Sequence, residues 1–366
     1  MDILVYNTII YPSKGGKMTK KNRIDLEVGM ILAADIYGDT GAILIGAGTV
    51  LDITHLNFIE RNRIDFVYIS EGRSHVASTC EEQSKHNVQE RHDQTVSKFK
   101  NVYFDFRLGR IPVFQEIEDI VEPLYDSILN DAHFTSKMWQ IHAYDDYTFD
   151  HSVRVSMISG LLAKWCGLSE TLIKDAATSG LLHDIGKCNI PDEILNKPAP
   201  LDPDEYKVIK THATLGYILV KEIPNISENI IKGVLQHHER MDGTGYPTGL
   251  KGNEIDPIAR IVAIADVYCA MTSDRVYKPA FHPFEVTSYI LEKCYHTLDF
   301  SISKIFLSKI APFFIGQYVK LNNEQCGEIV MTYNDDPARP LVRVGETYYD
   351  LRKHIELEII EMVETL

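Results

Sequence analysis

Residues 237–247 have the sequence HHERMDGTGYP, in which two adjacent histidines precede a glycine-rich turn. Paired imidazoles suit borderline transition metals such as iron, manganese or zinc. In the stretch from Gly243 to Pro247, glycine allows the backbone to approach a ligand closely. A solvent-exposed turn after a helix is the alternative interpretation, and the doubled histidine makes it the weaker one. The stretch therefore favours a metal-binding loop.

A second polar pair lies upstream, in His183-Asp184-Ile185-Gly186-Lys187. Burying two polar groups without partners is costly, and neighbouring helical side chains point about 100° apart. The pair can therefore hold two adjacent metal ions with Asp184 between them. From these residues alone, a purely structural role of the pair is as well supported as metal binding. The preceding helix is predicted to have an apolar face made of Ile173, Ala176, Ala177, Gly180 and Leu181.

A third candidate is Asp266, in the middle of the apolar run Ile261–Met271. A helix that is apolar all round is expected to be buried. A carboxylate inside it needs a cation or several hydrogen-bond donors. A metal ligand and a hydrogen-bonded structural carboxylate both satisfy that need.

The three clusters lie in a long region of helical pattern, so we expect a mainly α protein. Residues 96–311 are predicted to form an all-helical domain, in which Asp202-Pro203 starts a helix as an N-cap carboxylate followed by proline. Residues 1–75 are predicted to form a small β-rich module, for which a regulatory role is open. Residues 76–95 are polar without an apolar period, which indicates a linker. Residues 312–366 are predicted to form a small β-barrel-like module of short strands.

Specific elements are expected in both flanking modules. The first has strands at 30–37, 42–45 and 66–69 and a helix at 54–63; the last has strands at 317–321, 327–331, 341–344 and 348–351.

Composition limits the partners of the chain. Its 366 residues carry a formal net charge of −15, which argues against a long nucleic-acid polymer. A small anionic ligand remains compatible with that charge if metal ions are bound. The six cysteines are scattered without a CxxC pair, which favours reduced thiols in a cytoplasm. No apolar run approaches the ~18 residues of a membrane helix, so we expect a cytoplasmic protein without a membrane partner. Met1 and Met18 are alternative start codons.

These motifs resemble those of the HD-GYP family, a branch of the HD phosphohydrolase superfamily. The family patterns HDxGK and HHExxDGxGYP are both intact, at residues 183–187 and 237–247. The similarity also includes His151, Thr211-His212, Ala265-Asp266 and residues 272–278, and it extends over about residues 144–311. The resemblance implies an all-helical HD-type catalytic domain.

Carried over to this sequence, the resemblance implies a metal cage, with Asp184 bridging two divalent ions, iron or manganese. Lys187 would contact the scissile phosphate, while Arg275 and Lys278 would hold the ligand phosphates. Gly245 and Tyr246 would shape the substrate pocket. A solvated helix end is the alternative for Arg275 and Lys278. The implied metal ligands are His151, His183, Asp184, His212, His237, His238 and Asp266.

The implied activity is hydrolysis of cyclic di-GMP to pGpG by attack of a metal-activated hydroxide on phosphorus, and further hydrolysis to GMP is left open. A phosphodiesterase for another cyclic dinucleotide is one alternative. A catalytically weak cyclic-dinucleotide sensor or partner-binding module is another, although such sensors usually lose at least one ligand. A homodimer and a diguanylate cyclase partner are both open.

Three positions depart from the family pattern. Cys269 stands where many relatives carry a second acid, and Asp150 stands where a basic residue is common. Some relatives hold three metals with a glutamate one turn before the first histidine of the cage, where this chain has Tyr147. A neutral phenol is a poor ligand at neutral pH. The sequence therefore predicts two metals, with Asp145 or Asp146 as the substitutes that would allow a third.

Overall fold

The computed structural model describes residues 10–12, 18–27, 30–37, 43–45, 49, 51, 53–61, 64–70, 77–130, 147–273 and 281–363. The chain divides into two compact units, Met1–Asn87 and Val88–Leu366. Four residues discussed above, Asp145, Asp146, Arg275 and Lys278, lie outside the described residues.

The first unit is β-rich, as predicted. Strands β1 (Ile10–Pro12), β3 (Ala34–Tyr37) and β4 (Ile43–Ile45) form one antiparallel sheet, and β2 (Met18–Asn22) pairs with β5 (Phe66–Ser70). A short 3-10 helix, η1 (Arg23–Asp25), and helix α1 (Ile53–Arg61) complete the described elements. The small core includes Leu32, Ile36, Leu51, Ile59 and Val67.

Helix α2 (Ala77–Arg107) differs from the expectation for this part of the chain. The segment interpreted as a linker is helical from Ala77 onward, and the position of the domain boundary stays a prediction. Further along, Phe99, Tyr103 and Phe106 of α2 are buried in the core of the second unit. The rings of Phe99 and Tyr103 meet the Phe149 ring edge to face, at centroid distances of 6.2 and 5.1 Å. This part of α2 therefore belongs to the helical domain.

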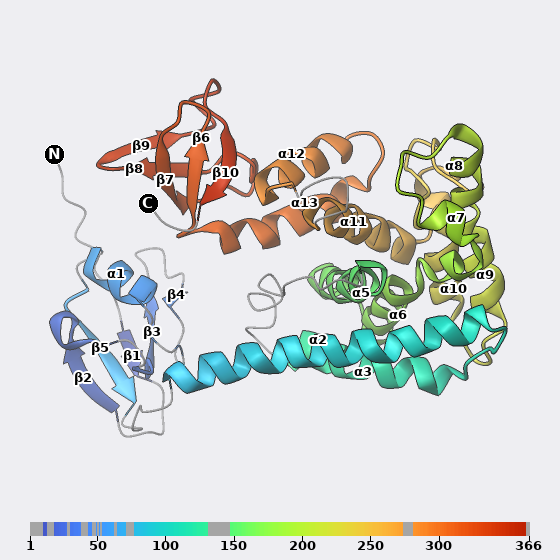
Figure 1. The fold of residues 1–366 in the computed structure, drawn as a ribbon. Helices are drawn as coiled ribbons and strands as arrows, with labels where there is room; N and C mark the ends of the chain where they lie inside the picture. Colours follow the sequence, from blue (N-terminus) through green and yellow to red (C-terminus); the bar gives the residue numbers. More distant parts are fainter. Residues whose placement is uncertain are drawn as a thin grey trace. The chain divides into compact units, whose positions relative to one another are not determined.

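The second unit is built around α5 (Tyr147–Trp165) and α6 (Glu170–Leu182), which pack closely against each other. Helix α3 (Phe114–Asn130) covers one side of this pair, and α11 (Pro257–Thr272) and α13 (Phe300–Ile310) cover the other (Figure 1). The close approach of α5 and α6 requires Gly180, because a Cβ there would lie 2.8 Å from the Val155 carbonyl oxygen. The mainly α prediction is confirmed.

The remaining helices surround this centre. Helix α8 starts at the predicted point, with Asp202 accepting from the Asp204 and Glu205 amides at 2.9 Å each. In chain order the elements are η2 (Ile185–Asn189), α7 (Asp192–Leu195), α8 (Pro203–Lys210), α9 (His212–Lys221), α10 (Glu228–Gln236), η3 (Gly252–Glu254) and α12 (Pro283–Lys293).

A five-stranded antiparallel sheet ends the chain, in the order β10-β6-β7-β8-β9. The first four strands in sequence match the predicted ones. Strand β10 was not predicted: its adjacent apolar residues Ile359 and Ile360 break the alternation, at a point where the β10–β6 register shifts. A short helix, η4 (Ala311–Phe314), joins α13 to the sheet, and the Phe314 ring lies 4.8 Å from the Phe284 ring of α12. The strands are β6 (Tyr318–Leu321), β7 (Cys326–Met331), β8 (Leu341–Val344), β9 (Thr347–Asp350) and β10 (Ile359–Val363).

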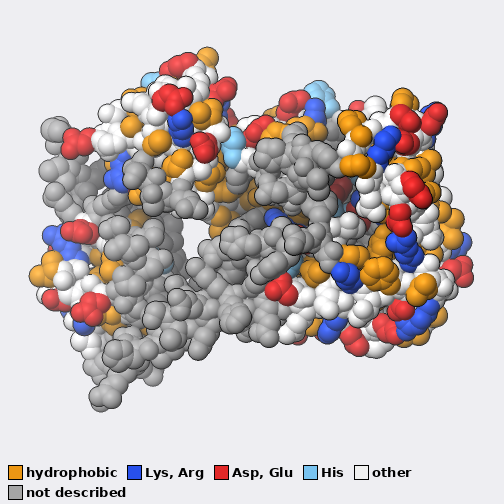
Figure 2. All heavy atoms as spheres, viewed as in Figure 1, with side chains coloured by type: hydrophobic (Ala, Val, Ile, Leu, Met, Phe, Trp, Pro, Cys, Tyr) orange, Lys and Arg blue, Asp and Glu red, His pale blue; other side chains and the backbone are white. Residues whose placement is uncertain are grey.

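The surface of the described residues carries charges of both signs, which are interspersed on the face drawn in Figure 2. Among the described helices, none combines the length and the apolar character needed to cross a membrane.

Candidate active site

The seven predicted metal ligands converge from five parts of the helical domain. His151 lies on α5, His183 and Asp184 follow the end of α6, and Asp266 lies on α11. His212 begins α9, and His237 and His238 follow the end of α10. Among the described residues, the ligand atoms form two groups, each within 4.8 Å: Asp184, His212, His237 and His238, and next to them His151, His183 and Asp266.

Three of the histidines are oriented in the same way by the last turn of the helix that precedes them in the chain. The Nδ1 atoms of His183, His212 and His237 donate to the carbonyl oxygens of Gly180, Ile209 and Val234, at 2.8, 2.7 and 2.7 Å. Each acceptor lies three residues before its histidine, where a helix end leaves carbonyl groups without helical partners. The Nε2 lone pairs are therefore turned into the site, an arrangement typical of metal-bound histidine.

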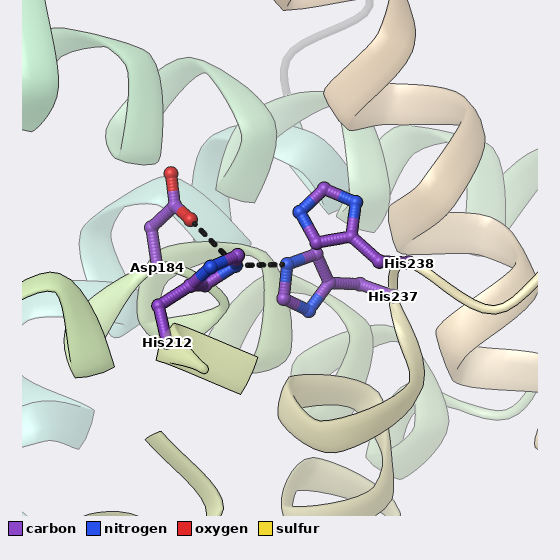
Figure 3. A group of neighbouring side chains, drawn as sticks. All are labelled: Asp184, His212, His237 and His238. Atoms are coloured by element: carbon purple, nitrogen blue, oxygen red, sulfur yellow. Dashed lines mark hydrogen bonds and ion pairs between the residues drawn. The ribbon is translucent and has the colours of Figure 1, made fainter. Parts of the chain in front are cut away.

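The donor set fits cations. The Nε2 atoms of His212 and His237 lie 3.2 Å apart, although both rings carry their proton on Nδ1 (Figure 3). Two lone pairs at this distance repel each other unless a positive charge lies near them. Asp184 Oδ1 lies 3.3 Å from His212 Nε2. The first group thus joins three imidazoles and a carboxylate, a set suited to a borderline divalent metal.

Asp184 reaches both groups of ligands. Its Oδ1 atom faces His212, whereas its Oδ2 atom lies 3.3 Å from His183 Nε2 and 4.0 Å from His151 Nε2. Asp266 completes the second group, with Oδ1 3.1 Å from His151 Nε2. The two oxygens of Asp184 therefore face histidines of different ligand groups.

The protonation states of the carboxylates suit ligand roles. Burial would raise the pKa of Asp184, but Lys187 and His183 outweigh it and hold that pKa well below its usual range. The pKa of Asp266 is likewise low, because its histidine neighbours overcome its burial. Both carboxylates are therefore ionised at neutral pH.

Most of the imidazoles resist protonation. Burial lowers the pKa values of His151 and His212, and it lowers those of His237 and His238 most, the latter to about 3. Metal binding requires neutral imidazole. The exception is His183, whose pKa is raised because Asp184 outweighs the effect of burial.

Lys187 and Tyr246, two predicted substrate residues, lie beside the cage. Lys187 Nζ donates to Asp184 Oδ2 at 2.5 Å, and the side chain is partly exposed at the cavity. The Tyr246 ring lies 4.6 Å from the His238 ring. At Gly245 a Cβ would lie 2.4 Å from the Arg240 amide nitrogen, so only glycine lets the loop fold back on the helix end.

Glu239 was not singled out from the sequence, yet it holds this loop. Its buried carboxylate accepts from the Thr248 amide and hydroxyl, at 2.8 and 2.6 Å, and from the amides of Gly249 and Leu250, at 3.2 and 3.1 Å. The sequence did carry a signal for this role. Glu239 is an acidic residue that precedes a glycine-rich turn, and backbone N–H groups in such turns can bind a carboxylate.

Two of the three departures from the family pattern, Asp150 and Cys269, have local explanations. Asp150 is buried and lies 3.2 Å from Nε2 of His92, another residue that the sequence analysis missed. Cys269 is buried, which raises the pKa of its thiol to about 12 and keeps it protonated. Neither residue displaces a predicted ligand.

A cavity of about 340 Å³ adjoins the cage. Its lining residues are His151, Asp184, Lys187, His238, Asp266, Val267, Ala270, Met271 and Tyr289.

Comparison with known proteins bears on this arrangement. The family described as HD domain matches residues 137–300, which contain all seven ligands. The chain carries an HD domain of the HD-GYP family. The sequence resemblance is thus confirmed.

Three relatives share this HD-GYP region. A cyclic di-GMP phosphodiesterase of Pseudomonas aeruginosa is 32% identical over 244 residues, which cover 67% of this chain and 59% of the relative. A cyclic di-GMP phosphodiesterase of Thermotoga maritima is 44% identical over 135 residues, 37% of each chain. The 3′3′-cGAMP-specific phosphodiesterase 1 of Vibrio cholerae is 40% identical over 146 residues, 40% of this chain and 34% of the relative. The matched region therefore spans roughly one third to three fifths of these proteins.

Proposed function

We propose that this protein is a metal-dependent phosphodiesterase that hydrolyses cyclic di-GMP. The observation that carries the proposal is the pair of ligand groups with Asp184 between them. Two adjacent divalent ions, when bound there, would supply Lewis acidity and lower the pKa of a water molecule to near neutrality. The complete set of ligands favours an enzyme over a sensor that has lost turnover.

The chain's own residues have distinct parts in this proposal. Asp184 and Asp266 contribute the negative charge of the cage, and the buried histidines contribute neutral nitrogen ligands. Lys187 lies at the cavity wall with its ammonium beside Asp184, where it can pair with a phosphoryl oxygen of the substrate. Asp242 is a poor proton donor for the leaving oxygen. Its hydrogen bonds from Thr244 lower its pKa and keep it ionised.

We further propose two ions, iron or manganese. Imidazole and carboxylate donors suit both metals, and the ligand atoms of the described residues fall into two groups. Helix α5 starts at Tyr147, one turn before His151, so this helical position offers no carboxylate for a third ion. Elemental analysis of protein purified anaerobically, with anomalous scattering from crystals, tests the number. Three fully occupied positions would contradict it.

Cyclic di-GMP is the preferred substrate because the Pseudomonas aeruginosa relative, which matches 67% of this chain, carries that activity in its name. The test is turnover by protein loaded anaerobically with iron or manganese, with pGpG and GMP separated by chromatography. Parallel assays use 3′3′-cGAMP, since one relative is named for it. Preferential hydrolysis of 3′3′-cGAMP would identify the alternative phosphodiesterase. Tight binding of cyclic di-GMP without turnover by metal-replete protein would support the sensor.

A further inference from the structure

The cavity beside the cage has two chemically different sides. One side is formed by metal-ligand residues and by Lys187. The other is formed by Val267, Ala270 and Met271 of α11 and by Tyr289 of α12. An anionic diester suits the first side, because cations and an ammonium would face it. The described residues on this second side carry no charge, so they suit a flat, weakly polar group.

Tyr289 is held at this cavity by the packing of α12 against α11. Its helix neighbours Val286 and Ile290 are fully buried, so the backbone that carries the tyrosine is fixed. The Tyr289 side chain itself is 38% exposed. An aromatic ring on a rigid helix, partly exposed at a cavity, has a π-face available for stacking at little cost in conformational entropy.

We infer that Tyr289 stacks against a nucleobase of the substrate while the scissile diester lies against Lys187 and the cage. The inference rests on the proposed function and adds to it a base-binding position at the apolar side of the cavity. Stacking tolerates any base, since every base has a π-face. Tyr289 therefore strengthens binding of cyclic dinucleotides as a class and does not distinguish guanine from adenine.

The competing explanation is that Tyr289 is a surface residue of α12. Lys293 Nζ lies 5.3 Å from the centroid of its ring, a contact that a surface tyrosine can also make. The two explanations differ in what happens when the ring is removed. A surface residue affects no ligand, whereas a stacking residue affects only ligands that contain a base.

The experiment compares Tyr289→Ala and Tyr289→Phe with a control, Tyr295→Ala. Tyr295 is a 63% exposed tyrosine just beyond α12 and does not line the cavity. Manganese-loaded proteins are titrated by calorimetry with a non-hydrolysable phosphorothioate analogue of cyclic di-GMP. Metal content, kcat and KM for cyclic di-GMP and 3′3′-cGAMP are measured as well. Methyl p-nitrophenyl phosphate serves as a diester without a nucleobase.

We expect Tyr289→Ala to raise Kd and KM about tenfold for both cyclic dinucleotides. Metal content and hydrolysis of the base-free diester are expected to be unchanged, and Tyr289→Phe and Tyr295→Ala are expected to resemble the wild type. An unchanged Kd in Tyr289→Ala would overturn the inference, as would an equal loss of activity toward the base-free diester. If the wild type binds the analogue through Tyr289 but hydrolyses no cyclic dinucleotide, the proposed function fails and the stacking inference stands.

Discussion

The Nε2 atom of His92 lies 3.2 Å from Oδ1 of Asp150, and both side chains are almost completely buried. The pair joins α2 to the first turn of α5, directly before the metal ligand His151. When one of two buried polar side chains in contact is removed, the other is left uncompensated in the protein interior. We predict that His92→Ala lowers the free energy of unfolding by about 3 kcal/mol, measured by urea denaturation.

A double-mutant cycle separates this contact from general loss of packing. The variant that combines His92→Ala with Asp150→Ala should be less destabilised than the sum of the two single variants. Additive effects would show that the two side chains do not interact.

Asp184→Ala is predicted to abolish metal binding and hydrolysis while the helical content stays near that of the wild type. The two carboxylate oxygens of Asp184 face histidines of both ligand groups. Metal analysis, turnover and circular dichroism check the prediction, with the exposed Asp335→Ala as the control. Normal metal content in Asp184→Ala would refute the bridging assignment.

Substrate affinity is predicted to depend on Arg275 and Lys278, to which the family resemblance assigns the binding of the ligand phosphates. A guanidinium and an ammonium both pair well with phosphate. Replacing both with alanine should raise KM for cyclic di-GMP with metal content unchanged. Normal binding of cyclic di-GMP by the double variant in calorimetry would contradict the role.

Glu239→Gln is predicted to loosen the loop that carries Tyr246. The amide replaces one acceptor oxygen by a donor that faces the loop's own N–H groups. Hydrogen bonds to a charged acceptor are stronger than those to a neutral one. Hydrogen exchange at the Thr248, Gly249 and Leu250 amides should therefore accelerate about 10- to 100-fold in the variant. Hydrogen-exchange mass spectrometry measures it. The exposed Glu228→Gln provides the control, and unchanged protection in Glu239→Gln would argue against the predicted loosening.

Short-range sequence patterns were enough to predict several features of the fold and of the candidate site. The motif residues His183, Asp184, His237 and His238 occupy one site, and Asp202 caps α8 as expected. These predictions depend on neighbours within a few residues, such as a carboxylate before a proline. Such short-range patterns are visible in a sequence because the chain itself brings the groups together.

The helix through residues 77–95 shows the limit of such patterns. The lack of an apolar period predicts a linker, but it excludes only a helix face that packs on a core. Glu, Gln, Lys and Arg, which are frequent in this segment, favour a helix without such packing. Strand β10 was missed for a related reason, because its register shift disturbs the alternation of apolar residues.

The sequence, together with its family resemblance, predicted the candidate metal ligands and a helical domain around them. Only the tertiary structure decided that Asp184 faces two ligand groups and that Tyr289 reaches the cavity. These relationships join residues on different helices. They depend on how helices pack and rotate against one another, which the periodicity of a single helix does not specify.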